Sequence, residues 1–212
     1  MLDVIASVEE SRRGALVVME GGEKLWLCRE ALFEHPTLRP GDEIDLDELK
    51  AWLLPRQYPE ALNIAVSLLA QRARASGEIR QKLQAKPYME DTIDMVLYKL
   101  EKENLLDDEA FAKEWAASRA RSQMGKTRIM QELLKKGIDR ETAQMAMEEI
   151  DQEEKDEAAA ALACRLIRRH WDEEDKRKAM NKILMAMARR GYGYDDSRRA
   201  IQQAMERMEE EE

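Results

Sequence analysis

The chain is 212 residues long and carries 44 acidic against 35 basic side chains, for a formal net charge of −9. This excess of acid argues against indiscriminate nucleic-acid binding by the molecule as a whole. Its two cysteines, Cys28 and Cys164, form no CxxC motif and are too few for a disulfide framework. No apolar stretch reaches transmembrane length and the first ten residues lack a signal-peptide pattern, so we expect a cytoplasmic protein.

The first part of the chain, 1–57, predicts a small β-rich module. Apolar residues alternate from Leu2 to Val8 in the manner of a strand. Two further β-prone runs, 15–19 and 24–28, flank Gly21-Gly22, and this arrangement is typical of a hairpin.

Helices are expected from residue 29 onwards. A short one over 29–34 should end at Pro36, and Asp45 should cap a second one over 46–54. Pro55 and Pro59 mark the junction beyond which the chain reads as helical throughout. Helix-forming residues dominate there. Because aromatic residues make up only 5% of the chain, its 13 Met are expected to fill much of the core, and a Met-rich binding groove is the functional alternative.

One helical pattern occurs three times in this second part. Each copy has two apolar residues four apart, a basic residue, a helix breaker and an apolar residue that packs back. The copies are Ile79, Leu83, Lys86, Pro87 and Tyr88; Ile129, Leu133, Lys136, Gly137 and Ile138; and Ile183, Met187, Arg190, Gly191 and Tyr192. Repetition at this period is typical of tandem supersecondary units that bury their hydrophobic faces against neighbours.

We therefore predict a mainly α fold of three tandem three-helix repeats that form an extended curved array. The expected helices are 59–74, 77–85 and 90–102, then 108–122, 125–136 and 140–151, then 154–170, 174–190 and 195–209. The expected divisions are the β-rich module over 1–57 and repeats over 58–106, 107–153 and 154–212, the last with an acidic C-terminal tail. Such an array presents a long surface, which favours recognition.

The string from Ala120 to Thr127 satisfies a relaxed phosphate-loop pattern. That motif needs a buried strand before the loop, so that backbone amides converge on phosphates at the start of the next helix. Here the preceding segment, 109–121, is an amphipathic helix with Phe111 and Trp115 facing inward. We interpret the string as a helix–turn–helix corner with Gly125 as the breaker, and expect no nucleotide chemistry.

No other catalytic or metal-binding constellation emerges. The two histidines, His35 and His170, lack ligand spacing, so we expect no metal and no cofactor. Asp107-Asp108 directly precedes an apolar helix and is interpreted as an N-cap. The chain is therefore predicted to be no enzyme.

Basic side chains cluster in repeats two and three and are the candidates for binding a partner or DNA. Such charges can form a solvated face, or as groups they can contact phosphates or an acidic partner surface. The candidates are Arg119, Arg121, Lys126, Arg128, Lys135, Lys136, Arg165, Arg168, Arg169, Lys182, Arg189 and Arg190.

From residue 58 to about 205 the chain resembles the RecX family. The matching residues in repeat one are Ala61 to Leu69, Arg72, Arg74, Ser76, Glu78-Ile79, Lys82-Leu83, Ile93, Val96-Leu97, Leu100 and Leu105 to Ala112. In repeat two they are Arg119, Gly125, Arg128-Ile129, Glu132-Leu133 and Lys136-Gly137-Ile138. In repeat three they are Lys182, Leu184, Arg189 to Tyr192 and Tyr194. Pro87 departs from the pattern, since the other two repeats have Gly there, and is expected to reshape the first loop.

The resemblance implies a modulator of the RecA recombinase, with roles in DNA repair, recombination and the SOS response. Family members bind the RecA filament on single-stranded DNA and limit strand exchange and the coupled ATP hydrolysis. The rival hypothesis from the residues themselves is an autonomous DNA-binding module that uses the basic face of repeats two and three. We expect a monomer, since the array needs no partner copy for its core.

Overall fold

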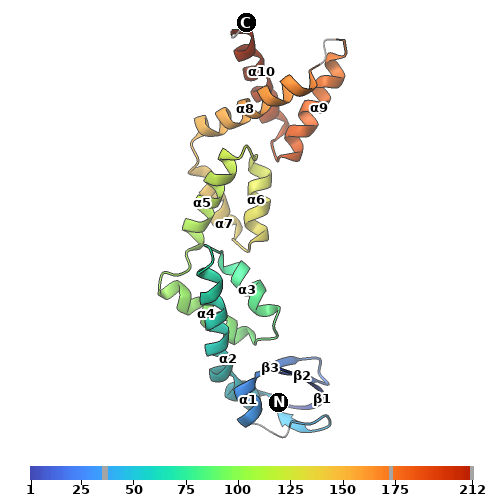
Figure 1. Ribbon diagram of the computed structural model, residues 1–212, viewed down its shortest axis with the longest axis vertical. Coiled ribbons are helices and arrows are strands. Elements are labelled where there is room, and N and C mark those ends of the chain that lie inside the picture. The colour runs from blue at the N-terminus through green and yellow to red at the C-terminus, as the bar shows by residue number, and fades with distance from the viewer. Residues whose placement is uncertain (35–37, 172–173, 211–212) are drawn as a thin grey trace. The chain divides into compact units, whose positions relative to one another are not determined.

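The computed structural model describes residues 1–34, 38–171 and 174–210, so His35 and Pro36 lie outside the described residues. The chain forms two compact units, Met1–Asp107 and Asp108–Glu212 (Figure 1). The first unit holds the sheet and repeat one, and the second holds repeats two and three. The mainly helical architecture with a small N-terminal sheet is confirmed.

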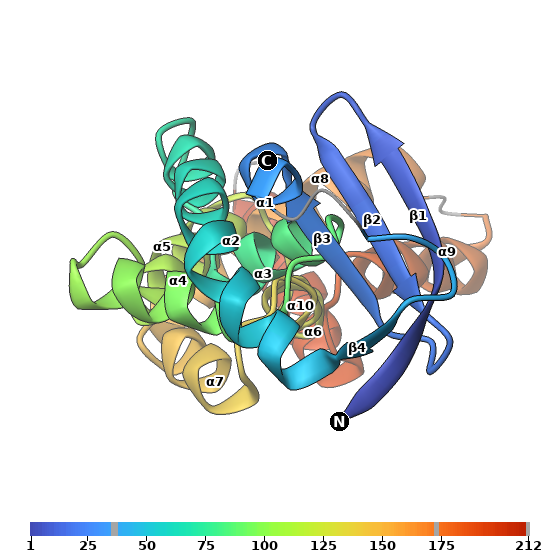
Figure 2. The ribbon, with the colours of Figure 1, turned by 90° about the horizontal axis from the view of Figure 1, so that it is seen from below.

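The sheet consists of β1 (Leu2–Ser11), β2 (Gly14–Met19), β3 (Lys24–Cys28) and β4 (Glu43–Asp45). A short helix, α1 (Arg29–Glu34), lies between β3 and β4 in the chain. The strands are antiparallel in the order β3-β2-β1-β4, and Figure 2 shows β1, β2 and β3 side by side. The predicted hairpin at Gly21-Gly22 is confirmed, because Met19 N donates to Glu23 O at 2.8 Å and Gly22 has a φ of 88°.

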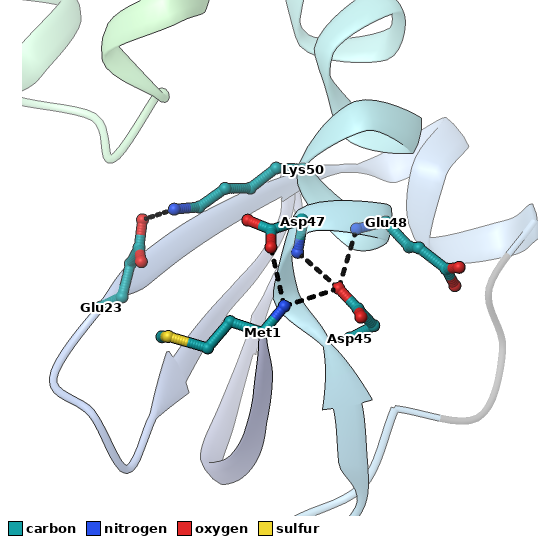
Figure 3. A network of polar contacts seen from close by, with 6 residues as sticks. All are labelled: Met1, Glu23, Asp45, Asp47, Glu48 and Lys50. Carbon is teal, nitrogen blue, oxygen red and sulfur yellow. Dashed lines mark hydrogen bonds and ion pairs between the residues drawn. The ribbon is translucent and has the colours of Figure 1, made fainter.

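Asp45 is the N-cap of the next helix, as expected from the sequence. Its Oδ1 accepts from the amides of Asp47 and Glu48 at 2.9 and 3.3 Å, and from the Met1 ammonium at 3.2 Å (Figure 3). The backbone bond from Glu48, followed by the N-terminus, lowers the pKa of Asp45. Three donors therefore hold β1, β4 and the helix start together.

That helix, α2 (Leu46–Leu69), runs without a break through Pro55 and Pro59. The expectation of a short helix over 46–54 and a new one from 59 was wrong. The residues buried on α2 recur every four positions at Leu49, Leu53, Gln57, Ala61 and Ala65, so one continuous face packs first on the sheet and then in repeat one. The division expected after residue 57 falls inside this helix.

The remaining helices follow the expected order, and their ends differ from the expected ones by a few residues. They are α3 (Ser76–Gln84) and α4 (Glu90–Lys102); α5 (Asp108–Arg121), α6 (Lys126–Lys135) and α7 (Arg140–Glu148); and α8 (Gln152–His170), α9 (Lys176–Arg189) and α10 (Tyr194–Glu210). The division expected after 153 falls in the first turn of α8.

The repeated pattern forms the middle helix of each repeat and the loop that follows it. Its apolar pairs are fully buried, as with Ile129 and Leu133 in α6. Gly137 has a φ of 86°, a conformation that glycine adopts without steric cost, and Ile138 N then donates back to Leu133 O at 3.1 Å. Gly191 and Tyr192 close α9 in the same way.

Pro87 gives the first repeat a different loop, as the departure from the pattern predicted. Proline cannot adopt a positive φ or donate a backbone hydrogen bond. Instead its carbonyl oxygen accepts from Trp26 N of β3 at 3.1 Å. The loop that differs from the other two is therefore the one that contacts the sheet.

Gln57 of α2 completes this attachment of the sheet to repeat one. Its buried side chain donates Nε2 to Trp26 O at 2.6 Å and accepts from Met89 N at 3.1 Å and Thr92 Oγ1 at 2.9 Å. Met89 in turn packs in the core of the sheet, while Trp26 packs against the core of repeat one. The β-rich module thus shares core residues with the first repeat.

Candidate functional site

The corner between α5 and α6 is a helix–turn–helix, as predicted for the string that resembles a phosphate loop. The chain turns at Gln123, with a φ of 57°, and Gly125 is the N-cap of α6. The amides that would cradle a phosphate already have partners, because Gly125 N donates to Arg190 O at 2.8 Å and Thr127 N to Gly191 O at 3.2 Å. These amides join α6 to the end of α9.

Three of the candidate arginines reinforce this joint between repeats two and three. Arg128 Nη1 donates to Arg189 O at 3.4 Å, and Arg190 Nη1 donates to Ser122 O at 3.3 Å. Arg165 of α8 donates Nη2 to the side chain of Gln123 at 2.8 Å. Arg128, Arg165 and Arg190 therefore lie together at the joint and hold backbone and side-chain oxygens there.

Two other candidates lie against an aromatic side chain of α5. The guanidinium of Arg119 lies 4.2 Å from the ring centroid of Trp115, and Nζ of Lys136 lies 4.0 Å from it. Arg119 also faces Glu132, with Nε and Oε2 2.9 Å apart, although the N–H is not aligned for a hydrogen bond. Cation–π contacts of this kind stabilise a fold by about 0.5–1 kcal/mol each. Arg119 and Lys136 therefore already contribute to the stability of repeat two.

The rest of the candidate set is exposed. Arg168 takes part in a further interaction within the chain. The other six form no side-chain ion pair or hydrogen bond within 1–34, 38–171 and 174–210: Arg121, Lys126, Lys135, Arg169, Lys182 and Arg189. The set therefore divides into charges used inside the second unit and charges that face solvent.

The described residues contain no group of three or more His, Cys, Asp or Glu side chains placed to hold a metal ion. His170 ends α8 and is half-buried, and His35 is outside the described ranges. Among the helices that the structure describes, none is long and apolar enough to cross a membrane.

Sequence reasoning missed the residues that join the parts of each unit. Gln57 occupies an otherwise apolar series of positions four apart, and that spacing was a usable signal. The contact between Gly125 and Gly191 had no such signal, because it joins two loops that are 66 positions apart in the chain (191 − 125).

The fold and the surface together define a class: a helical protein of tandem three-helix repeats with solvent-facing cations on repeats two and three. Three family models match the chain, the first, second and third three-helix domains of RecX, over residues 61–100, 107–147 and 152–201. The chain belongs to the RecX family, which is a family of regulatory proteins rather than a known enzyme family.

Curated relatives agree with this assignment. A protein named Regulatory protein RecX from Clostridioides difficile is 31% identical over 172 residues, covering 79% of this chain and 80% of the relative. The protein of the same name from Amycolatopsis mediterranei is 39% identical over 107 residues, covering 50% and 61%. The matches to that relative and to those from Corynebacterium efficiens and Halalkalibacterium halodurans span less than two thirds of the relatives' lengths.

Two solved structures share the fold. A crystal structure of RecX from Lactobacillus salivarius is 26% identical with a TM-score of 0.63, and covers 71% of this chain and 97% of that one. A crystal structure of regulatory protein RecX has a TM-score of 0.60 at 22% identity and covers 92% and 96%. The second likeness concerns the fold alone.

Proposed function

We propose that the chain binds the RecA filament on single-stranded DNA and restrains RecA recombinase activity and the coupled ATP hydrolysis. Six solvent-facing cations on repeats two and three of an otherwise acidic chain carry this proposal, together with the regulatory name of the relatives. A partner that combines protein and nucleic acid offers acidic groups of both kinds. A monomer that acts in the cytoplasm, during DNA repair, recombination and the SOS response, fits this role.

The proposed action is binding without chemistry. A chain that contacts neighbouring RecA protomers gains from several weak patches acting together, because each later contact is intramolecular. It shifts the filament toward whichever state it binds more tightly, and only by its difference in affinity between the states. Lower ATP hydrolysis would follow from the restrained filament.

Co-sedimentation tests the proposal against the rival DNA-binding module. The protein is spun with RecA filaments on single-stranded DNA and, separately, with the same DNA alone. We expect strong retention on filaments and weak retention on DNA. Tight binding to naked DNA that falls steeply with salt and is not improved by RecA would support the DNA-binding module instead, since phosphate contacts release counterions.

A charge-reversal pair with a matched control links binding to repeats two and three. Arg121→Glu with Arg169→Glu removes two exposed cations that form no ion pair in the described parts of the chain. Arg12→Glu with Arg13→Glu makes the same change at exposed residues of the turn between β1 and β2. We expect the first pair to weaken filament binding and the second to leave it unchanged, with similar melting of both. Equal retention of the two variants would contradict this placement of the surface.

A further inference from the structure

Helix α9 has an unusual charge composition. Among the described helices it alone contains no acidic residue, in a chain of net charge −9. Its basic residues are Lys176, Arg177, Lys178, Lys182 and Arg189. Three of them lie in the first turn, where the positive end of the helix dipole disfavours cations. The helix dipole therefore does not explain why cations gather at the start of α9.

Part of this charge lies along one face of α9. Lys178, Lys182, Met185 and Arg189 are spaced by four, three and four residues, so they share a face of the helix. All four are exposed, and Met185 keeps 61% of its surface accessible. We call these four residues the α9 face. In the ranges that the structure describes, its three cations form no side-chain ion pair.

A shallow open hollow of about 570 Å³ follows the α9 face and is also bordered by His170 and Asp175. Among the described residues that line this hollow, Asp175 is the one acidic residue. Its Oδ1 accepts from the backbone amide of Lys178 at 3.0 Å, because Asp175 is the N-cap of α9. The opposite side of α9 packs into the core of repeat three, so the α9 face points away from that core.

We infer that the α9 face docks an acidic segment of a protein partner. Cations one turn apart, such as Lys178 and Lys182, match carboxylates spaced four residues apart on a helix. Met185 lies between Lys182 and Arg189, which gives an apolar centre with a charged rim, the arrangement of protein–protein interfaces. The inference rests on the proposed function for the identity of the partner, whereas the chemistry of the surface is independent of it.

Nucleic acid fits the same face less well. Sites for single strands combine cations with aromatic side chains on which the bases stack. The α9 face has no aromatic residue, and its apolar member is a methionine. Phosphates would gain nothing from Met185, whereas an apolar side chain of a protein would contact it.

A synthetic probe tests the inference without RecA. The probe is a fluorescent helical peptide with glutamates four residues apart and one leucine between them, and its binding is followed by anisotropy at low salt. Lys178→Glu with Lys182→Glu should weaken binding about tenfold, which corresponds to about 1.4 kcal/mol. The control is Lys82→Glu with Lys102→Glu, which makes the same charge change at exposed lysines of α3 and α4. It should bind as the unaltered protein does.

Two more measurements separate protein from nucleic acid as the occupant. Met185→Ser should weaken binding of the leucine-containing peptide and leave binding of oligothymidylate unchanged. The inference would be overturned if the Lys178/Lys182 variant bound the peptide as tightly as the Lys82/Lys102 control. It would also be overturned if the protein bound oligothymidylate more tightly than the peptide and the Lys178/Lys182 variant lost that binding. If the unaltered protein binds the peptide through α9 but does not co-sediment with RecA filaments, the proposed function fails and the docking surface stands.

Discussion

Gly125 and Gly191 lie in direct backbone contact, since a Cβ atom added to Gly125 would fall 2.3 Å from the carbonyl carbon of Gly191. The contact joins the start of α6 to the end of α9. The first amides of a helix and its last carbonyls have no partner within the helix. Here amides at the start of α6 donate to carbonyls at the end of α9. The positive end of the α6 dipole faces the negative end of the α9 dipole. Repeats two and three are thus joined through their main chains.

This contact predicts that Gly125→Ala destabilises the second unit. The φ of Gly125 is −80°, which alanine adopts freely, so the effect is steric and should amount to about 1–3 kcal/mol. Gly193→Ala is the matched control, because its added Cβ would lie 3.4 Å from a carboxylate oxygen of Asp196, an ordinary contact. Thermal melting by circular dichroism compares the two. Identical melting temperatures would show that the joint is not closed in solution.

Neighbouring leucines of α6 test the assignment of the repeated apolar face. Leu133 is fully buried, whereas Leu134 is 43% exposed. Leu133→Ala should lower the free energy of unfolding by about 2–5 kcal/mol, because it removes packed atoms and leaves a cavity. Leu134→Ala should change it by less than about 1 kcal/mol. Urea denaturation measures both, and a reversed order would mean that the repeat packs through the other face.

Gln57 provides a test of the attachment between the sheet and repeat one. Gln57→Met keeps the volume but leaves Trp26 O, Met89 N and Thr92 Oγ1 without this partner. A buried group that loses its partner costs about 1–3 kcal/mol, so unfolding of the first unit should become easier by at least that amount. Gln81→Met at an exposed position of α3 is the control. A Gln57 variant as stable as the control would argue that the two parts fold separately.

The ion pair between Glu157 and Arg207 should make repeat three sensitive to acid. Arg207 donates to both carboxylate oxygens of Glu157 at 2.9 and 2.7 Å, and this lowers the pKa of the carboxyl group. The stabilisation is therefore present above the ordinary pKa of glutamate and is lost as the pH falls through the lowered value. Both side chains are more than a third exposed, so solvent screens the ion pair and the stabilisation is small.

Glu157→Gln checks this pH dependence. Melting of the unaltered protein should fall more steeply than that of the variant as the pH drops below the ordinary carboxyl range. Glu154→Gln, also on α8 and exposed, should follow the unaltered protein. Parallel curves for all three would contradict a role for the ion pair.

Much of the fold could be predicted from the sequence because its signals are local. Apolar spacing gave the middle helices, and the glycines at 137 and 191 marked where they end. The failure at Pro55 and Pro59 is also physical. A proline lacks one backbone donor and usually ends a helix, but in α2 the buried face continues through both prolines, and its packing outweighs the local preference.

The candidate surface was less predictable, since the sequence gives the sign of a charge but not its neighbours. Arg128 and Arg121 are seven residues apart and equally basic, yet Arg128 bonds across the joint to Arg189 O. The difference arises from a long-range contact that periodicity does not encode. The absence of acid from α9 was visible in the sequence, but only the structure places Lys178, Lys182 and Met185 on an exposed face.

The loop at Pro87 has a consequence for solubility. β3 is an outer strand, and the unpaired N–H and C=O groups of such a strand can recruit a strand from another molecule and start aggregation. At the middle of β3 both main-chain groups of Trp26 are taken, the N–H by Pro87 O and the carbonyl by Gln57. Repeat one therefore shields this edge of the sheet, and a chain whose first repeat is unfolded should be prone to self-association through β3.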